Sequence, residues 1–354
     1  MRVLVLFGGR SGEHEVSVVS ARAVLDAVRS LGHEGVPVGI TRDGAWVRCD
    51  PAEIDRVPPG GEPFDLVPDP TRDHGVDVAW PVMHGPYGED GCVQGLFELA
   101  DVPYVGAGVQ GSAAGMDKVT QKVMFRAAGL PVVDHVAFRD TQWRRDRDGV
   151  RGQIAALGLP VFVKPSRLGS SVGISKVAQP GELDDAVARA LTHDALVIVE
   201  AAGGPRELEI GLIESGSELM ASVVGEVVPD GEFYDYRAKY RGTWTQISIP
   251  ADIPSPVADR IADLAARAFR TIDCAGMARV DFFWDPASER LLLNEINTLP
   301  GITPSSMFPM LWEATGRPFT EVVALLLDHA LERHLRKQEL EAARAAAHDD
   351  EVGV

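Results

Sequence analysis

Three oxygen-bearing side chains lie in two apolar segments late in the chain and could hold a metal ion together. The first segment, 279–284, contains Asp281, and the second, 291–297, ends with Glu295 and Asn297. Both are rich in aliphatic, β-branched and aromatic residues and are joined by an Asp-Pro turn, so they predict a β-hairpin. Side chains alternate faces along a strand, and a simple register sets Asp281 opposite Glu295. Hard oxygen ligands of this kind suit Mg²⁺ or Mn²⁺ better than Zn²⁺.

The alternative for this hairpin is that Asp281 and Glu295 are ordinary solvent-facing residues of a half-exposed sheet. The next segment, 297–306, favours a site, because it is a polar loop punctuated by glycine and proline that leaves the second strand directly. Loops held by rigid strands commonly bind substrates. We therefore expect the hairpin to hold a metal nucleotide.

A second candidate site is the Gly/Ser-rich segment 166–173, which lies between predicted strands at 160–165 and 174–177. Its amides and hydroxyls could contact phosphate groups while Lys164, at the end of the first strand, supplies positive charge. It is not a Walker A loop, in which the lysine follows the glycines and opens a helix. The alternative is a plain hairpin loop with solvated serine and lysine side chains.

Two glutamates extend this candidate nucleotide site. Glu200 ends a further apolar strand, 197–200, and Glu207 follows after a short segment of small residues. Both carboxylates could accept hydrogen bonds from an adenine amino group and ribose hydroxyls, or could face water. An amphipathic helix from about 117 to 128 precedes the site, and the charged run 144–148 predicts a solvated loop.

The N-terminal third predicts the elements that would position a further ligand. A buried strand at 3–7 precedes a glycine-rich turn and a helix at about 16–31, and strands near 35–40 and 76–82 alternate with helices such as 93–100. This order predicts a parallel α/β domain up to about residue 112. The turn lacks the GxGxxG pattern, so dinucleotide binding is disfavoured.

Two residues of this domain are candidates for ligand binding. Glu13 lies in the turn before the helix, where the alternative role is an acid that favours the helix dipole. His84 lies just past the end of a strand, where open α/β sheets place ligands. Its alternative role is that of a capping or core histidine.

Composition bounds the class of protein. The chain has 354 residues, 45% of them hydrophobic and 24% charged, which is an ordinary globular composition for two or three domains. A formal net charge of -18, with no basic cluster, argues against a nucleic-acid partner. The apolar run at the N-terminus is shorter than a signal sequence, and no segment approaches the length of a membrane span. We therefore expect a soluble, cytoplasmic protein that binds neither nucleic acid nor membrane.

The cysteines do not suggest a disulfide framework or a zinc site. Cys49, Cys92 and Cys274 are far apart and form no CxxC pair. We expect all three to be reduced and buried.

Several of these motifs occur together in one known family, and the chain resembles the D-alanine–D-alanine ligases of the ATP-grasp superfamily over nearly its whole length. The strings that carry the resemblance are FGGRSGEHEVSVVSA (7–21), HGPYGEDGCVQGLFELADVPYVG (84–106), MDK (116–118), VKPSRLGSSVGISKV (163–177), FYDYRAKY (233–240) and ARVDFFW…LLLNEINTLPGITPSSMFP (278–309).

The resemblance implies a fold that combines α/β and α+β parts. It places an N-terminal parallel α/β domain at 1–112, a central ATP-grasp lobe at 113–203, a C-terminal ATP-grasp lobe at 204–335 and a flexible tail at 336–354. It further implies ATP, two Mg²⁺ or Mn²⁺ ions, a role in peptidoglycan precursor synthesis, and a homodimer. A monovalent cation is an additional candidate cofactor.

The resemblance also assigns residue roles by position. Lys118, Lys164, Ser171, Glu200, Glu207 and Lys239 match nucleotide-binding residues, and Asp281, Glu295 and Asn297 match metal ligands. Glu13, with His84 beside it, matches the residue that binds the ammonium group of the first D-alanine, while Arg279 and Gly301 match the oxyanion contacts. Ser306 and Met307 match contacts to the second D-alanine, and Ser170, Lys239 and Tyr240 match loop residues that close over the site.

Three functions are therefore compared. The first is ATP-dependent synthesis of D-alanyl-D-alanine through an acyl phosphate, and the second is an ATP-grasp ligase with another acceptor, such as D-lactate or D-serine. The third is a nucleotide-binding regulatory protein without turnover. The intact set of metal ligands, loop lysine and oxyanion residues disfavours the third.

Overall fold

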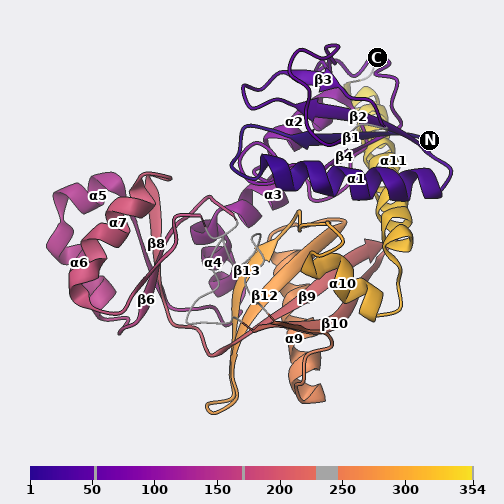
Figure 1. Cartoon of the computed structure of the whole chain (residues 1–354). Coiled ribbons are helices and arrows are strands. Elements are labelled where there is room, and N and C mark those ends of the chain that lie inside the picture. Colours follow the sequence, from indigo (N-terminus) through magenta and orange to yellow (C-terminus); the bar gives the residue numbers. More distant parts are fainter. Residues whose placement is uncertain (52–53, 170–171, 229–245, 353–354) are drawn as a thin grey trace.

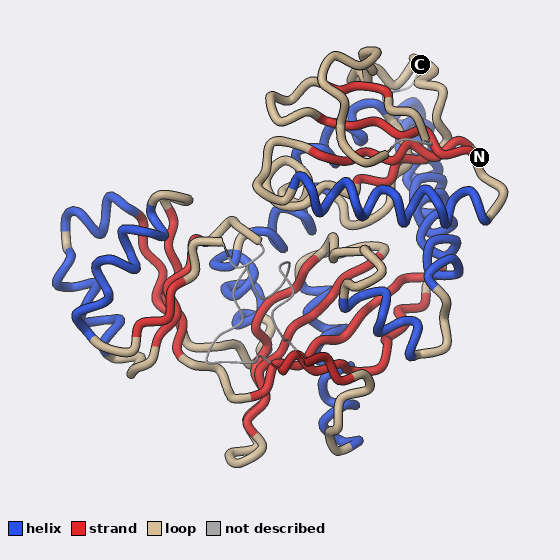
Figure 2. The backbone as a smooth tube through the Cα atoms, in the orientation of Figure 1, coloured by secondary structure: helices blue, strands red, loops and turns tan. Residues whose placement is uncertain are grey.

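The computed structural model describes residues 1–51, 54–169, 172–228 and 246–352. Figure 1 shows an N-terminal part, a central lobe and a C-terminal lobe, with the last helix running from the C-terminal lobe up along the N-terminal part. Figure 2 shows that each part contains its own sheet. The expected mixture of α/β and α+β parts is confirmed.

The N-terminal part is a sheet with helices on both sides. Its strand order is β3-β2-β1-β4, in which β1 pairs in parallel with β2 and β4, while β3 is antiparallel to β2. The three predicted strands pair in parallel as expected, and a turn after β2 adds a short antiparallel edge strand that was not predicted from the sequence. The elements are β1 (Arg2–Gly8), α1 (His14–Ser30), β2 (Glu34–Ile40), β3 (Trp46–Arg48), β4 (Val78–Pro81) and α2 (Cys92–Ala100).

Two helices, α3 (Val109–Met116) and α4 (Lys118–Ala127), connect this part to the central lobe. The lobe is an antiparallel sheet of order β5-β8-β6-β7. Its apolar face packs on α6 and α7 through residues such as Val163, Val187 and Val199. The elements of the lobe are β5 (His135–Arg139), α5 (Asp140–Arg145), α6 (Arg147–Ala155), β6 (Val161–Pro165), β7 (Ser175–Val177), the 3₁₀ turn η1 (Pro180–Glu182), α7 (Leu183–Leu191) and β8 (Leu196–Ala201).

The charged run 144–148 is not the loop that we expected. It contains the end of α5 and the start of α6, and Asp146 caps α6 by accepting a hydrogen bond from the Gly149 amide at 3.1 Å. Most of its side chains are exposed, but the flanking Trp143 and Val150 are buried in the lobe core. These apolar anchors hold two short helices where the charges alone favoured a loop.

The C-terminal lobe is an antiparallel sheet of order β11-β10-β9-β12-β13. One face packs on α9 and the other on α10 and α11, so residues of β9 and β12 are buried on both sides. The elements are β9 (Arg206–Ser215), β10 (Glu218–Val228), β11 (Gln246–Ser248), α9 (Ser255–Thr271), β12 (Met277–Asp285), β13 (Arg290–Asn297), α10 (Met307–Ala314) and α11 (Phe319–Val352).

Helix α11 joins the C-terminal lobe to the N-terminal part (Figure 1). Arg333 donates hydrogen bonds to the carbonyls of Gly106 and Tyr104 at 2.5 and 2.9 Å, and Lys337 forms an ion pair with Glu98 at 2.7 Å. The predicted boundary between residues 335 and 336 therefore lies inside a helix that continues to Val352. The boundary between 112 and 113 likewise lies inside α3.

The cysteines are free thiols, and only Cys274 is buried. Cys49 is half-buried and Cys92 is exposed, contrary to expectation. It is the first residue of α2, and that helix buries Val93, Phe97 and Ala100, which lie on its other side. Among the described residues, no helix is long and apolar enough to cross a membrane.

Candidate active site

The hairpin of β12 and β13 brings the predicted metal ligands together. Asp281 pairs with Glu295 in the antiparallel register, and the Asn297 amide donates a hydrogen bond to Asp281 Oδ2 at 3.1 Å. A β-bulge follows, so that Phe282 pairs with Leu293. The predicted register is confirmed over these residues.

Basic side chains hold both of these carboxylates in the structure. Arg279 donates from Nε and Nη2 to the two oxygens of Asp281, each at 2.7 Å, and its Nε lies 2.9 Å from Glu209 Oε2. Lys118 Nζ lies 3.1 Å from Glu295 Oε2. Asp281 is only 8% exposed, so its bidentate pair with Arg279 is shielded from water.

The donor set fits a hard divalent cation. Within the described ranges, no group of three His, Cys, Asp or Glu side chains is arranged to hold a metal ion. The predicted set instead combines two carboxylates, Asp281 and Glu295, with the amide oxygen of Asn297, all on paired strands. Oxygen ligands with positions left for phosphate and water are what Mg²⁺ prefers.

A buried charge cluster lies where the central lobe meets this hairpin. Lys164, on β6, and Lys122, on α4, both approach Glu200 on β8, at 2.5 and 2.9 Å. Burial alone would raise the pKa of Glu200, but the two ammonium groups lower it to about 2. Glu207 lies close enough to Lys164 to help raise the pKa of that lysine, against the effect of burial.

Helix α4 positions its basic residues because its first turn is capped. Asp117 accepts hydrogen bonds from the amides of Val119 and Thr120 and from the Ser166 hydroxyl, at 3.0, 3.1 and 2.8 Å. The next residue, Lys118, donates to the Leu168 carbonyl at 2.9 Å, so it contacts the loop after β6 as well as Glu295. The start of α4 therefore contacts the central lobe through Asp117 and Lys118, and the C-terminal lobe through Lys118.

The N-terminal part contributes an acidic side chain, Glu13, to the place where the central lobe meets the β12–β13 hairpin, which we call the junction. Glu13 precedes α1 and is 8% exposed. Its Oε2 would lie 3.1 Å from a Cβ atom at Gly85 and 3.3 Å from one at Gly169, so the carboxylate lies between two glycine-containing loops. A side chain at either glycine would crowd this carboxylate.

His84 lies near Glu13 but is buried in the N-terminal part. Its Nε2 is 3.3 Å from the Ser20 hydroxyl. Burial lowers the pKa of His84, and the Glu13 carboxylate opposes that effect in part. The side chain is therefore both a core histidine, as the alternative interpretation had it, and a neighbour of Glu13.

Glu89 is the most unusual acid of this part. It accepts a hydrogen bond from the Gly85 amide at 2.6 Å. Burial, reinforced by the Glu13 charge, raises the pKa of Glu89 to about 8. Its carboxyl group is thus largely protonated at neutral pH.

The loop after β13 brings two more predicted residues together. Ser306 precedes α10, and its Oγ lies 2.7 Å from the Thr303 hydroxyl and accepts from the Thr303 amide at 3.2 Å. A Cβ atom at Gly301 would lie 3.1 Å from Ser306 Oγ. Met307 is buried with Val227 and Leu311, so its side chain packs in the core.

Four predicted residues, Ser170, Ser171, Lys239 and Tyr240, lie outside the described residues. Sequence reasoning missed three others: Lys122, Glu89 and Glu209. Lys122 follows Lys118 by one helical turn and therefore shares its face, and Glu209 shares a strand face with Glu207. Glu89 belongs to the 84–91 motif, where only His84 was singled out.

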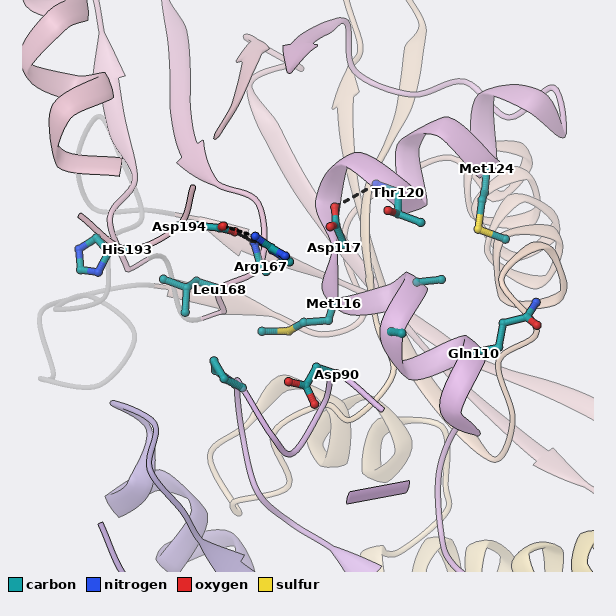
Figure 3. Close-up of a pocket in the computed structure, with 13 residues that line it drawn as sticks. Asp90, Gln110, Met116, Asp117, Thr120, Met124, Arg167, Leu168, His193 and Asp194 are labelled. Atoms are coloured by element: carbon teal, nitrogen blue, oxygen red, sulfur yellow. Dashed lines mark hydrogen bonds and ion pairs between the residues drawn. The ribbon is translucent and has the colours of Figure 1, made fainter. Parts of the chain in front are cut away.

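A cavity of about 750 Å³ lies beside this junction, where the N-terminal part, α3 and α4, and the central lobe meet. Figure 3 shows Met116 and Asp117 on the α3–α4 side, Asp90 and Leu168 on other sides, and Asp194 paired with Arg167. Leu168 links the cavity to the site, because its carbonyl binds Lys118.

Comparisons with known proteins agree with this arrangement. The chain matches the family model described as D-ala D-ala ligase N-terminus over residues 2–107 and the one described as D-ala D-ala ligase C-terminus over residues 124–328. It is 46% identical to a D-alanine–D-alanine ligase of Deinococcus radiodurans, over 94% of this chain and 98% of the relative.

Solved structures give the same result. A D-alanine–D-alanine ligase from Coxiella burnetii superposes with a TM-score of 0.86 at 32% identity, covering 98% of both chains. A D-Ala:D-Ser ligase from Enterococcus faecalis superposes with a TM-score of 0.82 at 33% identity, covering 93% of this chain and 99% of that chain. With both halves matched in order by the same family and the junction residues in place, the chain belongs to the D-alanine–D-alanine ligase family.

Proposed function

We propose that this protein joins two D-alanine molecules into D-alanyl-D-alanine, using ATP and forming ADP and phosphate, as a step in the synthesis of peptidoglycan precursors. The observation that carries the proposal is the junction of α4, β8 and the β12–β13 hairpin. There, Lys118, Lys164 and Arg279 converge beside a buried set of carboxylates in a member of this ligase family.

The nucleotide would lie between the two ATP-grasp lobes. Lys118 and Lys164 would contact its phosphate groups, since both ammonium groups lie at the inner edge of the junction. Glu200 and Glu207 would accept hydrogen bonds from adenine and ribose. Ser171 and Lys239 complete the proposed nucleotide-binding set.

Asp281, Glu295 and Asn297 would hold divalent cations, for which we propose two Mg²⁺ or Mn²⁺ ions. When bound, these ions would neutralise charge on the transferred phosphate group. In the structure, Arg279 pairs with Asp281 and Lys118 pairs with Glu295. These ion pairs would therefore have to rearrange when nucleotide and metal bind. A monovalent cation is a further candidate.

Peptide-bond formation requires an activated carboxylate, because a carboxylate is a poor electrophile. Transfer of the γ-phosphate to the first D-alanine gives an acyl phosphate, and attack by the second amine gives a tetrahedral intermediate that expels phosphate. Glu13, with His84 beside it, would bind the first ammonium group. The Arg279 guanidinium and the Gly301 amide would stabilise the oxyanion, a contact that contributes about 3–4 kcal/mol in comparable enzymes.

The second D-alanine would bind near the start of α10. Ser306, with Met307 next to it in the chain, lies beside Gly301 and so beside the proposed oxyanion contact. Ser170 and Tyr240 are proposed to close the site over both substrates. Exclusion of water would protect the acyl phosphate from hydrolysis.

The test is a competition among acceptors. The protein is incubated with ATP, Mg²⁺ and equal concentrations of D-alanine, D-serine and D-lactate, and the products are identified by mass. We expect mainly D-alanyl-D-alanine and ADP formation that depends on D-alanine, with L-alanine as the inactive control. Mainly D-alanyl-D-serine, as the name of the Enterococcus faecalis relative would suggest for that protein, would reassign the acceptor. Absence of D-alanine-dependent ADP would overturn the proposal.

Two finer points belong to the same proposal. We expect a homodimer, which light scattering of the purified protein measures directly. We also expect the protein to act in the cytoplasm, where ATP is available. Neither point alters the chemistry of the site.

A further inference from the structure

Two lysine ammonium groups lie against the carboxylate of Glu200. Lys164 Nζ lies 2.5 Å from Glu200 Oε2, and Lys122 Nζ lies 2.9 Å from Oε1. The side chain of Glu200 is only 2% exposed, and those of Lys122 and Lys164 are 1% and 10% exposed. One buried carboxylate is therefore shared by two ammonium groups.

The two lysines are held in different ways. Lys122 is anchored on the side away from Glu200, because its Nζ donates to the Asn294 carbonyl on β13 at 2.5 Å. The same Nζ lies 2.9 Å from Glu200 Oε1, so Lys122 contacts the carboxylate and β13 at once. Lys164, the more exposed of the two, lies at the end of β6 and leads into the Gly/Ser-rich loop.

This difference matters when phosphate groups arrive. Lys164 can neutralise a phosphate only by turning away from Glu200, which is buried and ionised. A buried carboxylate that loses its only partner costs several kcal/mol, enough to cancel what the phosphate contact gains. Lys122 removes this cost if it stays beside Glu200 while Lys164 moves.

We propose that Lys122 is a positioning residue that keeps Glu200 neutralised, so that Lys164 is free to bind the phosphate groups of the nucleotide. The inference rests on the proposed function in taking that nucleotide to be ATP. Lys122 itself does not contact the nucleotide. Its effect is therefore confined to ligands that carry phosphates.

A purely structural role is the competing explanation, because Lys122 also ties α4 to β13 next to Glu295. Gln121 makes a similar tie, since its Oε1 accepts a hydrogen bond from the Ile296 amide at 3.0 Å. If Lys122 were purely structural, losing its contact with β13 would lower the stability of the protein. It would not weaken the binding of phosphate-bearing ligands more than the binding of adenosine.

The experiment compares Lys122→Gln and Lys122→Met with the wild type, with Arg126→Met as the matched control. Arg126 lies one turn further along α4, and its ion pair with Asp134 is exposed. We expect both Lys122 variants to bind ADP and a non-hydrolysable ATP analogue about tenfold or more weakly by calorimetry. Inhibition by adenosine should change by less than about twofold, because adenosine does not recruit Lys164.

Steady-state kinetics gives a second readout. In the Lys122 variants the KM for ATP should rise by about tenfold while kcat at saturating ATP stays within about threefold. An equal loss of affinity for adenosine and ADP, or a loss in kcat alone, would overturn the inference.

The double variant Lys122→Met/Glu200→Gln tests the charge argument directly. With no carboxylate to neutralise, Lys122 should be dispensable, so ADP affinity should return to within about threefold of the Glu200→Gln single variant. If the Lys122 single variants fail to fold, the double variant decides alone, and an ADP affinity more than tenfold below that of Glu200→Gln overturns the proposal.

Failure of the inference is distinguishable from failure of the function. Wild-type protein that forms ADP in a D-alanine-dependent reaction, with Lys122 variants of unchanged ADP affinity, refutes only the role of Lys122. Wild-type protein without that reaction refutes the proposed function, while the ADP measurements still test Lys122.

Discussion

Glu200 and Glu89 are two glutamates within one junction, and their carboxyl groups are in opposite states. Glu200 has two ammonium groups within 2.9 Å, which lower its pKa to about 2. Burial and the nearby Glu13 carboxylate raise the pKa of Glu89 to about 8, while Lys118 offsets this only in part. Burial acts on both groups in the same direction, so the direct cation partners decide the difference.

The comparison explains how a chain of net charge -18 can bind a polyanion. On the side of the two ATP-grasp lobes, Lys122, Lys164 and Arg279 each form an ion pair with at least one buried carboxylate. On the side of the N-terminal part, Glu89 is neutral because it is protonated, so it needs no cation to balance it. Repulsion of phosphate is thus reduced by pairing on one side and by protonation on the other.

The largest expected effect comes from removing the charge of Asp281, the proposed metal ligand that is paired with Arg279. Asp281→Asn keeps the shape but weakens the binding of cations, so D-alanine-dependent ADP formation should fall by about 100-fold or more. Folding should be retained, because Arg279 still has Glu209 as a partner. The matched control is Asp285→Asn, at the exposed hairpin turn of the same strand. Near-normal turnover of Asp281→Asn at saturating Mg²⁺ would contradict the metal assignment.

The second effect is a loss of stability when Glu200, the ionised glutamate of the two, is neutralised. Glu200→Gln removes the carboxylate that Lys122 and Lys164 contact directly, so the free energy of unfolding should fall by about 3 kcal/mol at pH 7. Denaturant unfolding measures this, with the exposed Glu218→Gln on β10 as the control, which should change it by less than about 0.5 kcal/mol. If Glu200→Gln is as stable as the wild type, the cation pairs do not hold Glu200 ionised.

The sequence predicts the β12–β13 hairpin much better than it predicts the contacts around Glu200 and Glu89. Asp281 and Glu295 could be placed opposite each other because strand alternation and a short turn determine a hairpin register locally. The segment 297–306 could likewise be assigned as a loop, because glycine and proline interrupt the strand pattern there. Each of these features depends on residues that are close in the sequence.

Contacts between lobes could not be predicted in this way. The spacing of Lys118 and Lys122 places both on one face of α4, but periodicity does not indicate that β8 brings Glu200 to that face. The alternating charges at 144–148 indicated a loop because they outweighed the apolar spacing of Trp143 and Val150, which packing against the lobe core decides. The state of Glu89 likewise depends on loops from separate segments that enclose it.

The third effect tests the protonated glutamate through pH. The folded protein binds a proton at Glu89 up to about pH 8, whereas the unfolded chain releases it near the ordinary glutamate pKa, so wild-type stability falls as pH rises between these values. Glu89→Gln removes this dependence. Relative to the wild type, it should gain about 2 kcal/mol between pH 6 and pH 8.5. Urea unfolding across this range measures the gain, and a difference that does not vary with pH would place the proton elsewhere.

The smallest effect extends the comparison to a buried base. His329, on α11, is 4% exposed and its Nε2 lies 3.3 Å from Glu214 Oε2. Burial, together with Arg333 and Arg336, lowers the pKa of His329 to about 4. Burial thus favours the neutral form of His329, as it does at Glu89, and the two arginines add to the effect.

The sign of the pH effect at His329 is opposite to that at Glu89. Between pH 6.5 and pH 4 the unfolded chain binds a proton at this histidine that the folded protein does not, so stability is lost on acidification. His329→Gln should reduce the loss between pH 7 and pH 5 by about 1 kcal/mol, measured by urea unfolding. The exposed His348→Gln on the same helix is the control. If His329→Gln loses stability on acidification as steeply as the wild type, the folded protein protonates His329 as readily as the unfolded chain does, which would contradict the lowered pKa.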